Sequence, residues 1–393
     1  MRWIGVAIAL AAGCGFHHGA ATSGDGGGGG GGGGDGDLDA PRDAVPDALR
    51  CAAVEIAASD SHNCARETDG SVWCWGYDSR GQTGVDPATA TTCGATPCTL
   101  SPNQIAMPAP ATALGLGNEN TCAIAGDAVY CWGANGVGEF GNGMMTDSIP
   151  PLAIAERGGA TAVQGGFNVT CSLNRGALSC SGGNTFGDIG DGSNAERLAL
   201  YQTLNNATSL AKGYMDTCAV VGTAVECWGD NSAGEIDSTG QSRANPTAIT
   251  GVTNATAVTV GYTHACALLP DHSVTCWGAN TVGQLGNGLT ATTSGPVTAL
   301  VSNIVQVAAM GDHTCALDGA GAVWCWGEDY TVTPTQIALA ATATQIAAGS
   351  YDDCALLHDG TVWCWGWDVY GQYGNGTMNG TVVNTPVQAS LCM

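Results

Sequence analysis

The sequence is poor in basic residues, in phenylalanine and in long apolar runs. Its 393 residues include ten Lys and Arg and four Phe, against 34 Asp and Glu, so the net charge is −24. Because phosphate contacts need a basic patch, this balance argues against a nucleic-acid-binding protein. No apolar run approaches the roughly 18 residues that a membrane-spanning helix needs, so we expect no such helix.

Three residue types are abundant instead, with 61 Gly, 19 Cys and 11 Trp. So many thiols would need metals to account for them in a reducing cytosol, whereas exported proteins join them as disulfides. The cysteine count therefore indicates an oxidising compartment.

Residues 1–13 are predicted to be a signal peptide. Arg2 supplies a positive charge, and residues 3–12 form an apolar stretch that is too short to cross a bilayer. Small residues then lead directly into Cys14, which resembles a bacterial lipoprotein signal. The resemblance implies that Cys14 becomes the lipidated (palmitate-bearing) N-terminus, and Gly15 after it favours the outer membrane or the cell surface. An ordinary secretory signal is the alternative.

Residues 14–50 are predicted to be a flexible tether. They contain nine consecutive glycines at 26–34, followed by aspartates that alternate with Gly, Ala and Pro. Such a segment has little apolar surface to bury and cannot offset its ordering entropy. The aspartates do not match a calcium-binding loop, because Ala40 and Pro46 stand where that loop needs Gly and Glu.

Residues 51–393 consist of one motif repeated seven times. After a cysteine pair, six copies have Trp-Gly and the third has Ser181-Gly182. Asn or Asp stands two residues further on, and G-Q-x-G or a relative usually follows, as at 283–286. The cysteine pairs of the seven copies are 64/74, 122/131, 171/180, 218/227, 266/276, 315/325 and 354/364.

Each copy is predicted to form four short strands. In the fifth copy these are 257–260, 264–268, 273–277 and 296–300, all rich in Val, Thr, Ile and Ala and bounded by turn residues. No helical period is present. Four strands per repeat of this length are typical of a propeller blade. We therefore expect an all-β protein, a seven-bladed β-propeller of four-stranded antiparallel blades.

The motif H-x-C-A-L…G-Q-L-G, complete at 264–286, resembles the regulator of chromosome condensation repeat. The resemblance covers about residues 52–390 and implies a seven-bladed propeller. Two copies depart from the pattern, because the sixth lacks G-Q-L-G and the first carries an insertion around Cys93 and Cys98. Known relatives include a nucleotide exchange factor and a secreted bacterial inhibitor of β-lactamases, and neither role follows from the fold.

The cysteine pairs are predicted to be disulfides within the hairpin of the second and third strands. In the second copy, a turn at Gly126-Asp127 places Cys122 opposite Cys131 as a non-hydrogen-bonded pair, whose close Cα approach suits a disulfide. The same reasoning gives the bonded residues Cys64, Cys74, Cys122, Cys131, Cys171, Cys180, Cys218, Cys227, Cys266, Cys276, Cys315, Cys325, Cys354 and Cys364.

Hairpins one residue longer need a left-handed residue in a bulged turn. Gly70, Gly321 and Gly360 stand at that position, and His272 takes it in the fifth copy.

Four further cysteines lie outside the hairpins. Cys93 and Cys98 are expected to staple the insertion of the first copy. Cys51 and Cys392 stand at the two ends of the array, and with a last strand at 386–391 they would lock the ring.

We find no pattern for a catalytic, metal or cofactor site. His62, His264 and His313 each stand two residues before the first cysteine of a copy. Blades spread such equivalent positions around the ring, whereas metal ligands converge on one ion. We therefore expect the histidines to be structural hydrogen-bonding residues. Paired carboxylates and a G-x-S-x-G motif are also missing.

Some aromatic residues vary between copies, so the repeat does not explain them. Phe167, Tyr214 and Tyr262 precede the first cysteine of consecutive copies by four residues, and Trp367 and Tyr77 follow Trp-Gly in the seventh and first copies. Since ring closure makes these last two copies neighbours, we expect the five rings to share one face and bind a partner.

These features predict a non-enzymatic binding module, tethered to the bacterial cell envelope, that presents one propeller face to a protein or glycan. An envelope enzyme acting on polysaccharide or peptide, and a purely structural envelope protein, are the alternatives.

Overall fold

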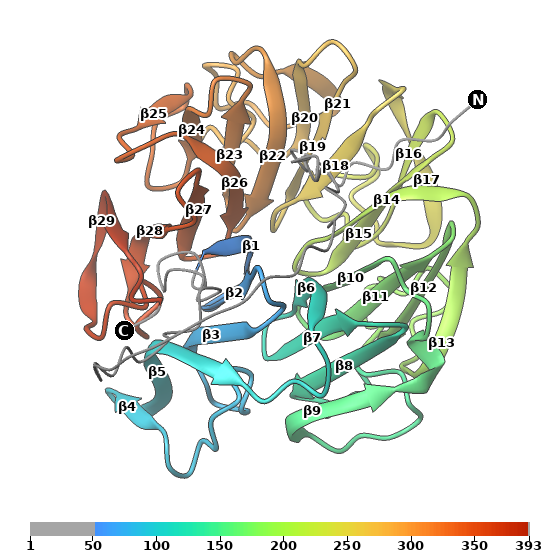
Figure 1. The fold of residues 1–393 in the computed structure, drawn as a ribbon. Helices are drawn as coiled ribbons and strands as arrows, with labels where there is room; N and C mark the ends of the chain where they lie inside the picture. Colours follow the sequence, from blue (N-terminus) through green and yellow to red (C-terminus); the bar gives the residue numbers. More distant parts are fainter. Residues whose placement is uncertain (1–51, 392–393) are drawn as a thin grey trace, which may run out of the picture. The chain divides into compact units, whose positions relative to one another are not determined.

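The computed structural model describes residues 52–391, which form seven antiparallel sheets arranged as the blades of a ring (Figure 1). The predicted seven-bladed β-propeller is therefore correct. The signal peptide, Cys14, the tether, Cys51 and Cys392 lie outside the described residues, so the predictions made for them remain predictions.

Each blade uses consecutive strands, ordered from the ring centre outward. The first blade consists of β1 (Ala53–Ala58), β2 (His62–Glu67), β3 (Val72–Tyr77), β5 (Thr96–Ile105) and β4 (Thr91–Cys93). The second consists of β6 (Ala111–Leu116), β7 (Asn120–Ala125), β8 (Ala128–Gly133) and β9 (Ser148–Ile154), followed by a 3-10 turn, η1 (Ala155–Arg157). The third consists of β10 (Ala162–Gly165), β11 (Val169–Asn174), β12 (Ala177–Gly182) and β13 (Arg197–Leu204).

The other four blades follow the same order. The fourth has β14 (Ala207–Lys212), β15 (Asp216–Val221), β16 (Ala224–Gly229) and β17 (Arg243–Thr253). The fifth has β18 (Ala257–Val260), β19 (His264–Leu268), β20 (Val274–Gly278) and β21 (Thr293–Thr298). The sixth has β22 (Ile304–Met310), β23 (His313–Asp318), β24 (Val323–Gly327) and β25 (Thr335–Ile337). The seventh has β26 (Ala343–Ala348), β27 (Asp352–Leu357), β28 (Val362–Asp368) and β29 (Asn379–Gln388).

The hydrophobic core lies between the blades. Second strands such as β7 are buried along their whole length, because neighbouring blades cover both faces of the sheet. Outer strands such as β29 are largely exposed. Each apolar cluster combines residues of two adjacent blades, so a single blade could not bury its own apolar surface.

The cysteines inside the blades are joined as the sequence predicts. Every in-repeat pair is a disulfide across the hairpin of the second and third strands. Cys122 lies opposite Cys131 in the ladder, with Cα atoms 4.1 Å apart. Cys93 and Cys98 are also bonded, and the insertion they staple adds β4 as a fifth strand to the first blade.

The hairpin turns also match the prediction. Gly70, Gly321 and Gly360 have φ angles of 84°, 85° and 82°, and His272 adopts 64° at the same place in the fifth blade. A residue with a Cβ is strained at such φ, so glycine is favoured and His272 is a tolerated exception.

Tryptophans join adjacent blades. The Trp after the second cysteine is fully buried and donates its indole N–H to the carbonyl of the second residue of G-Q-x-G in the preceding blade. The pairs are Trp132 to Gln82, Trp228 to Asp188, Trp277 to Glu235, Trp326 to Gln284 and Trp75 to Gln372, at 2.7–3.0 Å. In the sixth copy, which lacks G-Q-x-G, the hydroxyl of Tyr330 accepts the bond from Trp365 at 2.7 Å.

A buried arginine replaces the inter-blade bond of the tryptophan in the third blade, which has Ser181 at the tryptophan position. Arg157, from η1, donates to Ser181 Oγ at 2.6 Å and to the carbonyls of Phe140, Glu139 and Thr170. Burial lowers the pKa of Arg157 to about 9. The guanidinium thus links the second and third blades where the repeat lost its indole.

The first and seventh blades meet without exchanging a strand. The last strand is β29, which pairs with β28 and ends at Gln388, so the predicted strand at 386–391 was placed too late. The ends still meet, because Ala53 N donates to Gly360 O at 3.0 Å and Leu391 packs on the cluster that contains Ala53. The last strand of the fifth blade, predicted at 296–300, likewise begins earlier, at Thr293.

Candidate binding site at the centre of the ring

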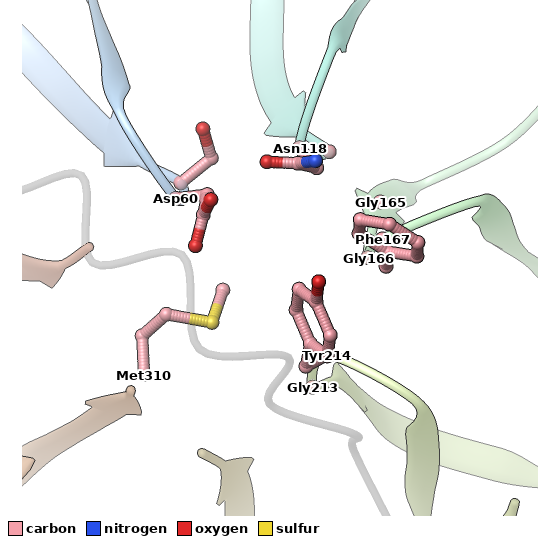
Figure 2. A pocket seen from close by; sticks show the side chains of 10 residues that line it. Asp60, Asn118, Gly165, Gly166, Phe167, Gly213, Tyr214 and Met310 are labelled. Atoms are coloured by element: carbon pink, nitrogen blue, oxygen red, sulfur yellow. The ribbon is translucent and has the colours of Figure 1, made fainter. Parts of the chain in front are cut away.

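The turns between the first and second strands converge at the ring centre. Innermost strands line the axis of a propeller, so the turns that follow them surround its mouth. Figure 2 shows these turns around a small pocket. The pocket is lined by Ser59, Asp60, Gly117, Asn118, Gly165, Gly166, Phe167, Gly213, Tyr214 and Met310.

Neighbouring turns are bonded through their backbones. Asn118 N donates to Gly166 O at 2.9 Å, and Phe167 N donates to Tyr214 O at 3.1 Å. The turns approach so closely that a Cβ on Gly166 would lie 2.4 Å from Gly213 O. Glycine is therefore required for this close approach, and the turns present a fixed rim to any ligand.

Three of the predicted binding residues form a line of rings on this rim. The centroids of Phe167 and Tyr214 lie 4.5 Å apart, and those of Tyr214 and Tyr262 lie 4.7 Å apart. The line ends at Asp60, whose Oδ1 accepts a hydrogen bond from the Tyr262 hydroxyl at 2.7 Å. Burial, followed by the charge of Asp60, raises the pKa of Tyr262, so its hydroxyl stays protonated and donates.

The other two predicted residues contact different partners from those expected. Trp367 and Tyr77 come from the adjacent seventh and first blades, but Trp367 packs on Tyr351 at 6.0 Å and Tyr77 packs on Tyr370 at 5.0 Å. Burial raises the pKa of Tyr351, and the charge of Asp60 raises it further.

We call the surface formed by these seven rings the aromatic face. It consists of Phe167, Tyr214, Tyr262, Tyr351, Trp367, Tyr370 and Tyr77. Sequence reasoning missed Tyr351 and Tyr370, although both stand in the loops that supply the other five. A count of aromatic residues over whole loops, rather than at fixed repeat positions, would have found them.

Acidic residues surround the aromatic face. The same two sets of loops carry Asp60, Glu119, Asp230, Asp312 and Glu328. Burial and the charges of Asp312 and Asp329 raise the pKa of Glu328. No Lys or Arg occurs after Arg243, so the fifth, sixth and seventh blades supply no cation to offset these charges.

The histidines of the repeat form buried hydrogen bonds, and these bonds join neighbouring blades. His62 Nε2 lies 2.8 Å from Thr121 Oγ1, and His264 Nε2 lies 2.8 Å from Thr314 Oγ1. Burial lowers the pKa of both His62 and His264 to about 3, so both rings are neutral. Each ring thus joins two blades rather than turning towards a common ion.

One group of potential metal ligands occurs among residues 52–391, namely Cys315, Cys325 and Asp353. The two cysteines are bonded to each other, which leaves one carboxylate and no chelating set. Asp353 accepts from the Tyr330 hydroxyl at 2.7 Å and lies 3.0 Å from His313 Nε2. His313 and Asp353 are buried and Tyr330 is partly buried, and this network joins the sixth and seventh blades.

Comparison with known proteins identifies the repeat. Two family profiles, both described as the Regulator of chromosome condensation (RCC1) repeat, match residues 53–82, 255–284 and 343–372 in one case and 271–317 in the other. The chain is an RCC1-repeat β-propeller. The sequence matches no curated protein. Among residues 52–391, no helix is long and apolar enough to cross a membrane.

Solved structures share the fold. Human WBSCR16 has a TM-score of 0.71 at 17% identity, covering 82% of this chain and 95% of that chain. Yeast RCC1 (Prp20) bound to Kap60 has a TM-score of 0.70 at 18% identity, covering 87% and 86%. The structure of Prp20p from Saccharomyces cerevisiae, titled with its binding to Gsp1p and histones, has a TM-score of 0.68 at 18% identity, covering 87% and 88%.

Proposed function

We propose that this RCC1-repeat propeller is a non-enzymatic binding module whose aromatic face holds a protein partner. The observation that carries the proposal is the three groups of packed rings on the aromatic face, which the repeat itself does not require. Trp367 and Tyr351 are 38% and 42% exposed, so they offer apolar surface that folding leaves uncovered. Rigid aromatic side chains are enriched at the cores of protein interfaces.

The RCC1 neighbours favour a protein over a glycan as partner. Yeast RCC1 was solved with Kap60 bound, and Prp20p is described with its binding to Gsp1p and histones. Because their identity to this chain is low, their partners cannot be assigned to it. These neighbours do show that a propeller of this fold can bind proteins.

We further propose that Cys14 anchors the propeller to the bacterial outer membrane, with residues 14–50 as the spacer. The eight disulfides among residues 52–391 support an oxidising compartment. Mass spectrometry of the mature N-terminus tests the anchor, with a lipid-modified Cys14 as the expected result. A mature chain that begins at another residue would contradict the lipid anchor and leave the binding face untouched.

The binding face is tested by cross-linking on intact producing cells. The variant Tyr214→Ala/Trp367→Ala removes two rings that make no side-chain hydrogen bond within the described residues. We expect it to lose the cross-linked partner while its melting temperature stays within a few degrees of the wild type.

The matched control is Tyr201→Ala, because Tyr201 is 38% exposed on the outer strand β13. This control should keep the partner. A partner retained by the double variant, or lost equally by the control, would contradict the face assignment. A wild-type protein that captures nothing would favour a purely structural envelope protein.

A further inference from the structure

The pocket at the ring centre is small and carries one acid. Its volume is about 10 Å³, which holds a single water-sized group. The rest of its wall is formed by glycine backbone and by Ser59, Asn118, Phe167, Tyr214 and Met310, and Figure 2 shows Asp60, Tyr214 and Met310 pointing inward. A ligand here must therefore present a compact head group.

The carboxylate of Asp60 has capacity to bind a cation. Among residues 52–391, its hydrogen bond from Tyr262 occupies Oδ1, and no Lys, Arg or His forms an ion pair with it. A carboxylate has about four lone-pair sites, so most of its accepting capacity remains. The bond from Tyr262 also fixes the carboxylate at the pocket wall.

The aromatic wall suits a cation rather than a neutral donor. Ring faces are negative, and an ammonium group placed over Phe or Tyr within about 6 Å of the ring centre is attracted to it. Phe167 and Tyr214 lie beside the pocket, and Met310 adds a polarisable thioether. A divalent metal is unsuited to the pocket, because a space for one water-sized group leaves no room for the six or more oxygens that surround a calcium ion.

The surrounding charge would attract a basic partner. The loops that meet at this face carry the five acids, of which Asp60 lines the pocket. Arg80 pairs with Glu119 and Asp147, and Arg175 lies in a hairpin turn. Lys212 is fully buried, and its ammonium is held by Asp188 and by the carbonyls of Asp216 and Gly213. A negative face of this kind raises the rate at which a positive ligand arrives.

We infer that the central pocket receives one primary ammonium group, namely a lysine side chain of the partner protein. The lysine ammonium is a compact point charge with three donors, whereas the arginine guanidinium is a broad planar fork. A pocket for one water-sized group therefore selects lysine over arginine. This inference rests on the proposed function, since it names the chemistry by which the aromatic face would hold its partner.

The test measures binding of two fluorescent peptides, octalysine and octaarginine, to the purified propeller by anisotropy at physiological salt. The two peptides carry the same charge, so a nonspecific field binds them alike. We expect octalysine to bind the wild type more tightly than octaarginine. Asp60→Asn should weaken octalysine binding about tenfold, because it removes a charge-assisted hydrogen bond.

The matched control is Asp271→Asn, which makes the same change of charge in the exposed turn before β20. It should leave octalysine affinity within about twofold of the wild type, since the residue lies far from the pocket in a hairpin turn. Equal weakening by both variants, equal or tighter binding of octaarginine, or no octalysine binding would each overturn the inference.

The experiments distinguish a wrong lysine pocket from a wrong binding face. A cross-linked partner that depends on Tyr214 and Trp367 but survives Asp60→Asn keeps the binding face and rejects the lysine pocket. Lysine-selective binding without any captured partner keeps the pocket and rejects the face as the protein's functional interface.

Discussion

Trp75 of β3 donates its indole N–H to the backbone carbonyl of Gln372, 2.7 Å away and 297 residues later in the chain. Asn63 Nδ2 donates to the same carbonyl at 3.0 Å. The seam between the seventh and first blades therefore repeats the bond that joins most of the other blades. The ring is closed by ordinary blade packing, whether or not a disulfide also joins its ends.

The first prediction follows from this equivalence. Trp75→Phe should lower the free energy of unfolding by about 1–3 kcal/mol, because it removes one buried hydrogen bond and leaves a small cavity. Trp228→Phe, at the interface of the third and fourth blades, should cost a similar amount. Urea unfolding measures both, and a seam variant as stable as the wild type would contradict the equivalence.

The second prediction concerns Arg157, which replaces the missing tryptophan of the third copy. Arg157→Met should destabilise the protein by about 3–5 kcal/mol, because it leaves buried carbonyls and hydroxyls without a donor. Ser181→Trp combined with Arg157→Ala should recover part of the loss, because the new indole can donate to Glu139 O as other blades do. Arg175→Met, at an exposed turn, is the control for loss of charge.

Calorimetric melting of the four proteins decides this case. An Arg157→Met variant that melts with the wild type would show that water satisfies the same groups. A double variant that melts below Arg157→Met would show that the indole cannot fit this interface.

The third prediction concerns Asp78, which stands where five other blades use Asn or Asp to cap the loop before G-Q-x-G. Its Oδ1 accepts from Thr83 N at 2.9 Å, and its Oδ2 is buried without a partner. Burial raises the pKa of Asp78 to about 7. In the second blade, Asn135 occupies the equivalent site and its amide donates to Met144 O.

Because the folded pKa lies above the unfolded value of about 4, the folded state holds a proton that the unfolded state releases. Asp78 therefore does not lower the free energy of unfolding below pH 4, where both states are protonated. Between about pH 4 and pH 7 its buried carboxyl lowers the free energy of unfolding progressively as the pH rises. Asp78→Asn should therefore stabilise the protein by about 1–2 kcal/mol at pH 8 and have little effect at pH 4.

The measured quantity is the difference in unfolding free energy between this variant and the wild type across pH 4–8. The difference cancels the opposing effect of His62 and His264, whose lowered pKa values cost stability as the pH falls below about 6.5. Asp127→Asn, in an exposed hairpin turn of the second blade, should give a flat difference. A flat difference for Asp78→Asn would contradict the burial argument.

Local features of this propeller could be read from the sequence, whereas the bonds between blades could not. The hairpin register at Cys122 and Cys131 and the left-handed turn at Gly70 depend on residues within one copy, so spacing and turn chemistry are sufficient to predict them. The bond from Trp75 to Gln372 joins the first copy to the last, and no repeat pattern names the partner across an interface.

The same limit explains the errors at the candidate site. Equivalent repeat positions identified Phe167, Tyr214 and Tyr262, which stack in the structure as one line. Tyr351 stands one residue and Tyr370 three residues after the compared positions of the seventh copy, so the comparison passed over them. The use of Arg157 in place of a tryptophan was also out of reach, because its side chain enters the interface from η1.

The last prediction concerns the ring-closing disulfide between Cys51 and Cys392, which lie outside the described residues. Described neighbours support it, because Ala53 N bonds to Gly360 O and Ser390 N bonds to Gly374 O in the same blade. Peptide mapping without reduction should recover the 51–392 pair, and a free Cys51 in the mature protein would contradict it.

Loop-closure entropy gives upper bounds of about 6 kcal/mol for this bond and about 2 kcal/mol for 93–98. The double variant Cys51→Ser/Cys392→Ser should therefore melt at a lower temperature than Cys93→Ser/Cys98→Ser. The reverse order would show that the packed seam alone restrains the chain ends.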